Sequence, residues 1–66
     1  MTQYEVMERV AKISSVSGDD EVAHGMEDDL YEDFVRYVAL AGPSGLSEIA
    51  KKVLSTKELD FARWCA

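Results

Sequence analysis

The sequence predicts a small all-α protein: a three-helix bundle with a C-terminal segment, a candidate short fourth helix, packed back on it. Apolar residues recur at three- and four-residue spacing in three stretches, which is the period of an amphipathic helix. Turns rich in Gly and Ser separate these stretches, and no stretch alternates as a β-strand does. We expect residues 1–66 to form one domain. A chain this short buries only about 60% of its unfolded surface, so self-association or a partner would help to stabilise it.

The first predicted helix runs from Thr2 to about Ser15. Thr2 with Glu5 three residues later matches a capping box, in which the two residues satisfy the free N–H groups of a helix start. One face of this helix carries the apolar residues Val6, Met7, Val10 and Ile13.

The central stretch, residues 19–41, holds the longest helical pattern of the chain. Its main apolar face consists of Ala23, Met26, Leu30, Phe34, Tyr37, Val38 and Ala41, and is widened by Val22, Tyr31, Val35 and Leu40. The apolar arc exceeds the roughly 100° of a helix that meets one neighbour, so we expect packing on at least two sides. Ser17 or Asp19 is a suitable N-cap. Gly25 costs about 1 kcal/mol inside a helix, yet we expect the helix to continue through it.

Gly42 and Pro43 end the central helix, and Ser44 is a natural N-cap for a third one, from about Gly45 to Leu54. We expect its buried stripe to be Leu46, Ile49, Ala50 and Val53. Ser55 and Glu58 match a second capping box, which would start the short fourth helix. Leu59, Phe61 and Trp64 fit neither period, and we expect them to fold back over the bundle.

Charge narrows the classes of function. The net charge is −6, and eight acidic residues lie within residues 19–33 without any Lys or Arg among them. This argues against direct binding to nucleic acid or to anionic membranes, both of which need a basic surface. The one cysteine, Cys65, forms no disulfide within the chain. With neither a signal-peptide pattern nor a membrane-length apolar run, we expect a cytoplasmic protein.

The only histidine lies in the acidic stretch. His24, Glu27, Asp28 and Tyr31 project from one side of the central helix, where a His and a carboxylate one turn apart can share a metal or a proton. No second ligand motif and no activated nucleophile accompanies them, and phosphate-loop, zinc and dinucleotide motifs do not occur. We therefore expect His24 to hydrogen-bond Asp28 or a backbone group, and expect neither a cofactor nor enzymatic activity.

Two segments together carry a resemblance: Ala23-His24, Glu27-Asp28 and Leu30-Tyr31 in the central helix, and the ending Leu59-Asp60-Phe61-Ala62-Arg63-Trp64-Cys65-Ala66. They are similar to short uncharacterised proteins of actinobacteria and their phages. The resemblance implies no activity. It implies a phage-encoded or accessory protein acting inside a bacterial cell; for a phage-encoded protein, the expected partner is a host protein and the expected location the host cytoplasm. It also implies one site where the tail docks on the central helix, formed by His24, Asp28, Tyr31, Phe61, Arg63 and Trp64.

The favoured function is a small acidic protein-interaction module, whose partner is a host protein or a second copy of itself. The expected partner-binding residues are Glu27, Asp28, Asp29, Tyr31, Glu32, Asp33 and Val35, in which carboxylates steer the partner and apolar side chains supply contact. Two alternatives stay open. One is a DNA-mimic inhibitor of a nucleic-acid-binding protein, in which carboxylates imitate phosphates. The other is a metal-binding protein that uses His24.

Overall fold

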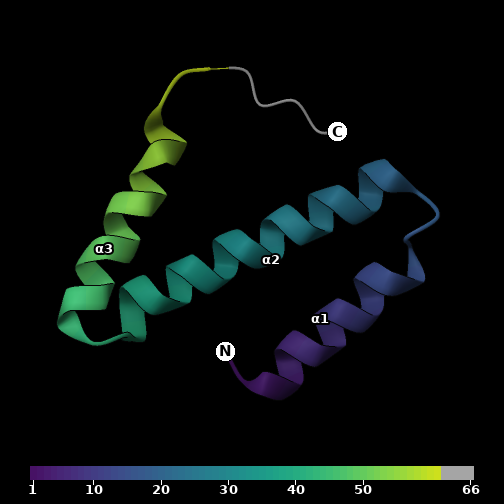
Figure 1. Ribbon diagram of the computed structural model, residues 1–66, viewed down its shortest axis with the longest axis horizontal. Helices are drawn as coiled ribbons and strands as arrows, with labels where there is room; N and C mark the ends of the chain where they lie inside the picture. Colours follow the sequence, from purple (N-terminus) through teal and green to yellow (C-terminus); the bar gives the residue numbers. More distant parts are fainter. Residues whose placement is uncertain (62–66) are drawn as a thin grey trace.

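The chain forms three α-helices and one short 3-10 helix in a computed structural model, which describes residues 1–61 (Figure 1). The elements are α1 (Gln3–Ser15), α2 (Asp20–Ala41), α3 (Ser44–Leu54) and η1 (Ser55–Glu58). No strand occurs in the described part of the chain. The predicted all-α class and the continuous central helix through Gly25 are both confirmed.

Two of the three helix starts use the predicted side-chain caps. The Glu5 N–H donates to the Thr2 hydroxyl at 3.1 Å, and the Val22 N–H donates to the Asp19 carboxylate at 3.2 Å. The predicted cap at Ser44 is wrong, because the backbone is already helical there and Pro43 stands at the cap position. Proline suits the start of a helix because the first N–H groups have no partner inside it.

Helix α2 is the central element and has a neighbour on each side, as its wide apolar arc predicts. Helix α1 runs back alongside it, and the Arg9 guanidinium meets the Asp33 carboxylate at 2.8 Å (Figure 1). Helix α3 packs against the other side of α2, and within residues 1–61 it makes no contact with α1. Helix α2 therefore holds the other two helices together.

The α2–α3 junction is the tightest contact in the molecule. Ala39 and Ala50 are each only 6% exposed, and they are the buried hydrophobic residues of the described chain. The Ser47 hydroxyl donates to the Ala39 carbonyl at 2.5 Å and joins the two helices beside them. Gly42 ends α2 with a φ of −77°, so space and not a left-handed backbone favours glycine there: a Cβ would lie 2.6 Å from the Val38 carbonyl oxygen.

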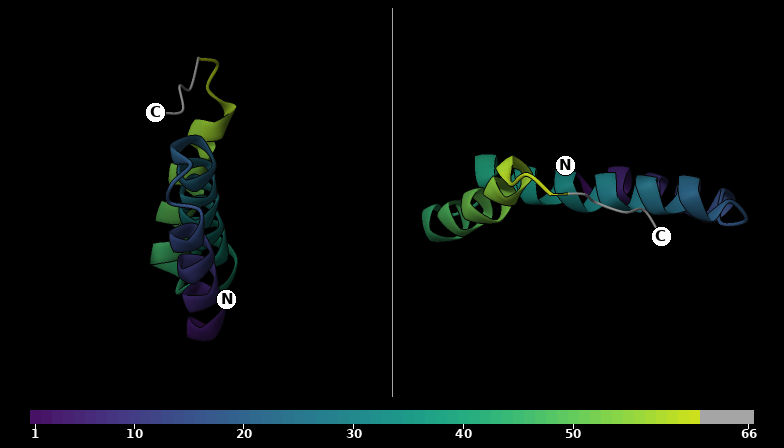
Figure 2. Two further views of the ribbon diagram at one scale, coloured as in Figure 1. Left: turned by 90° about the vertical axis from the view of Figure 1, so that its right-hand side faces the viewer. Right: turned by 90° about the horizontal axis from the view of Figure 1, so that it is seen from above.

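The three helices lie in a single layer. The principal extents are 39 × 34 × 10 Å, and views from two further directions show the three helices side by side in one layer (Figure 2). The expected burial of the α3 stripe is correct only for Ala50. Leu46, Ile49 and Val53 are 50%, 61% and 52% exposed, because α3 meets α2 along an edge and no second layer formed by residues 1–61 covers its apolar face.

The predicted fourth helix is present as the single 3-10 turn η1. Its capping box is wrong: the Ser55 hydroxyl donates back to the Lys52 carbonyl, and η1 has no side-chain cap. The Lys57 ammonium reaches the Glu32 carboxylate at 2.9 Å and ties this turn to α2. Two of the six residues of the predicted tail-docking site, Arg63 and Trp64, lie outside the described residues. Within residues 1–61, no helix has the length and apolar character needed to cross a membrane.

Candidate interaction surface

The predicted partner-binding residues do not share one surface, because they lie on more than one side of α2. Asp28, Tyr31, Glu32 and Val35 face the side of α3 and η1, where they line one groove. Asp29 lies on the side of α1, with Arg9 and Met26. Consecutive helical residues are about 100° apart, so these five acids, which fall within seven positions, are spread over about 240° around the axis. The acidic stretch is continuous in sequence but divided in space.

Two of these carboxylates are neutralised within the chain. Asp33 pairs with Arg9 across the α1–α2 contact at 2.8 Å. Glu32 pairs with Lys57 at 2.9 Å and with Arg36 at 2.7 Å. These hydrogen bonds, first that from Lys57 and then that from Arg36, favour the charged form and lower the pKa of Glu32 below its ordinary value of 4.5. Both carboxylates therefore have a structural role in holding α1 and η1 on α2.

His24 lies beside Asp28, as the sequence predicts. The imidazole Nε2 is 3.5 Å from the Asp28 carboxylate, one helical turn further along α2. The other ring nitrogen, Nδ1, is buried and has no hydrogen-bond partner among the described residues. In the same part of the chain, no group of three or more His, Cys, Asp or Glu side chains is arranged to hold a metal ion.

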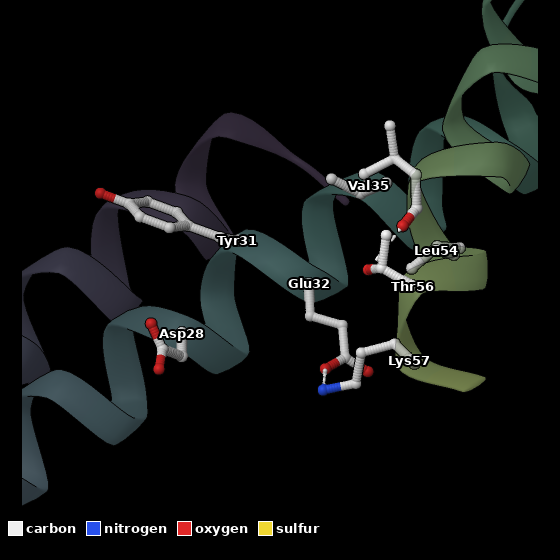
Figure 3. Close-up of a pocket in the computed structure, with 8 residues that line it drawn as sticks. Asp28, Tyr31, Glu32, Val35, Leu54, Thr56 and Lys57 are labelled. Atoms are coloured by element: carbon white, nitrogen blue, oxygen red, sulfur yellow. Dashed lines mark hydrogen bonds and ion pairs between the residues drawn. The ribbon is translucent and has the colours of Figure 1, made fainter. Parts of the chain in front are cut away.

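A groove opens where α3 and η1 diverge from α2 (Figure 3). It has a volume of about 270 Å³, and α3 and η1 contribute Val53, Leu54, Thr56 and Lys57 to its walls. In Figure 3 the Glu32 and Lys57 side chains point toward one another, whereas Tyr31 points away from this pair. Four of the predicted partner-binding residues thus meet at one place, and Tyr31, 60% exposed, is the large apolar surface they present.

A larger apolar surface continues from this groove across the layer. Two adjoining depressions share Phe34: one lies over α1 and α2, the other over α2 and α3. None of the side chains that line them is charged. We call this surface the apolar face; it consists of Met1, Val6, Leu30, Tyr31, Phe34, Val35, Val38, Leu46, Ile49, Ala50 and Val53.

The sequence pattern predicts that most of the apolar face lies in the interior of the bundle. Phe34 on α2 and Ile49 and Val53 on α3 each belong to an apolar stripe with the spacing of a buried helix face. This spacing is the same whether the stripe packs against its own chain or against another molecule. Two features of the sequence do indicate an exposed apolar face: the breadth of the apolar arc on the central helix, and a chain that is too short to form a large core. Comparisons with protein families, with curated proteins and with solved structures give no match to this chain.

Proposed function

We propose that this chain is a non-enzymatic protein-interaction module that binds through the apolar face. One observation carries this proposal. Five large side chains of this face, those of Tyr31, Phe34, Leu46, Ile49 and Val53, are 50–61% exposed, while the buried core of the described chain is two alanines. Burial of apolar area contributes about 25 cal/mol per Å². A chain that is 47% hydrophobic therefore gains stabilising free energy when a partner covers this face, and does not gain it while the face is exposed to water. Large contiguous apolar patches mark interaction sites on soluble proteins.

The acidic residues have a secondary role in this proposal. Asp28 lines the groove that adjoins the apolar face and shares Tyr31 and Val35 with it. Charges at the rim of an interface increase the rate of encounter and orient the partner, while the apolar centre supplies most of the affinity. The resemblance to actinobacterial and phage proteins keeps a host protein as a predicted partner.

The internal ion pairs favour this proposal over DNA mimicry. A mimic presents unpaired carboxylates to a basic groove, but Glu32 and Asp33 already pair with cationic side chains of their own chain. The two proposals differ in salt dependence. Binding through the apolar face survives moderate salt, whereas binding by carboxylates alone weakens steeply as salt screens the charges.

Protection of an introduced thiol tests the proposal. In a Cys65→Ser background, the Ile49→Cys variant places a thiol on the apolar face, and the Leu40→Cys variant is the matched control. Ile49 and Leu40 are 61% and 83% exposed, so both thiols are accessible in the isolated chain. We expect a thiol reagent to react more slowly at position 49 when a partner covers the face.

Reaction rates should be measured in purified protein over a range of concentrations and in a bacterial lysate. Protection that rises with protein concentration indicates self-association, and protection only in the lysate indicates another protein. Equal rates at positions 49 and 40 under every condition would contradict the proposed function. Protection in dilute purified protein, independent of concentration, would show that the chain covers its own face and would contradict it equally.

A further inference from the structure

We infer that the apolar face is the interface of a homodimer, in which two copies of this chain pack layer on layer around a two-fold axis. This inference rests on the proposed function and names its partner. The three α-helices of one chain form one layer about 10 Å thick, and stable domains are built from at least two packed layers. A second copy supplies the missing layer.

The accessible area matches what such a dimer requires. The chain exposes 5289 Å², whereas a compact monomer of 7.4 kDa exposes about 4,200 Å². The excess of about 1,100 Å² exceeds the roughly 800 Å² that each partner buries in a standard interface. The radius of gyration is likewise 13.6 Å, against about 11 Å for a compact chain of this length. Pairing by the apolar face removes this excess without a change of fold.

The shape and charge of the face suit contact with its own copy. In a two-fold interface both chains contribute the same surface. If residue i of one chain contacts residue j of the other, then residue j of the first chain contacts residue i of the second. The surface must therefore be complementary to itself. Phe34 is 54% exposed and stands between two depressions lined by uncharged residues. An exposed aromatic ring beside an apolar hollow can complement its own image under a two-fold rotation. Uncharged side chains around both hollows keep like charges out of the contact between two chains that each carry a net charge of −6.

The closing experiment is sedimentation velocity on the full chain from about 1 to 200 µM, the range in which weak and moderate dimers dissociate. We expect wild type to show twice the 7.4 kDa chain mass at the upper end. The Phe34→Asp variant should sediment as a monomer. The Leu40→Asp variant should remain dimeric, because Leu40, 83% exposed, lines neither depression and lies about 120° around α2 from Phe34.

A gentler variant covers the case in which Phe34→Asp does not fold. Phe34→Ala should raise the dimer dissociation constant by more than tenfold, roughly the effect of losing a central aromatic anchor. Two results would overturn the inference. One is a wild-type chain that stays monomeric at every concentration. The other is a dimer that the Phe34→Ala substitution leaves unchanged and the Leu40→Asp substitution dissociates. If the purified chain is a monomer but the thiol of Ile49→Cys is still protected in lysate, only the homodimer inference would be contradicted. The proposed function would then stand, with another protein as the partner.

Discussion

Gly25→Ala should stabilise the protein, because α2 passes through Gly25 as an unbroken helix. A Cβ built at this position meets no atom within 4 Å, so the substitution adds no clash. The backbone there is helical with negative φ, which alanine adopts without strain. The full difference in helix propensity is then gained, about 1 kcal/mol. For a chain of this length it corresponds to a rise of about 4–8 °C in melting temperature.

Two other glycines provide matched controls. Gly45 lies in the first turn of α3 with open space around it, so alanine there should give a smaller gain, since a helix end contributes less than an interior. Gly42→Ala should destabilise by about 0.5–3 kcal/mol, the usual range for a substitution with a steric conflict. Its Cβ would lie 2.6 Å from the Val38 carbonyl oxygen, which already accepts the Gly42 N–H at 2.8 Å.

Urea denaturation followed by far-UV circular dichroism, at one fixed protein concentration, measures all three variants. Fixed concentration matters because the stability of a self-associating chain depends on it. An order of stability with Gly25→Ala highest and Gly42→Ala lowest is expected. If Gly25→Ala were neutral or destabilising while Gly42→Ala were tolerated, the continuous α2 and its close turn into α3 would both be refuted.

Two further predictions concern the contacts that hold α3 and η1 on α2. The lowered pKa of Glu32, caused by Lys57 and Arg36, means that this group stabilises the fold fully above pH 4.5 and loses its contribution as pH falls through the lower folded-state value. The stability difference between wild type and Glu32→Gln should therefore shrink on acidification; a difference that is constant between neutral and acidic pH would contradict the pairing. Ala50→Leu should cost about 1–3 kcal/mol by overpacking the α2–α3 contact, and thermal denaturation that shows no loss would mean that the helices are not in close contact at this residue.

The sequence alone determined the local structure of this protein. Apolar periodicity located the three helices, and Thr2 and Asp19 marked two of their starts, because capping depends on side chains only a few residues away. The pairing of His24 with Asp28 was also predictable, since residues four apart on a helix are neighbours wherever that helix lies. Such features need no knowledge of the rest of the fold.

Only the tertiary structure decided which faces are covered. Periodicity specifies that Leu46, Ile49 and Val53 share one side of a helix, but that side is buried only if another layer lies on it. The α2–α3 contact, which buries Ala39 and Ala50, sets α3 beside α2 within one layer, and this leaves the stripe exposed. The same arrangement brings Lys57 to Glu32 and Arg9 to Asp33, pairs that are 25 and 24 residues apart. Burial and long-range pairing depend on how helices are placed relative to one another, which no single helix encodes.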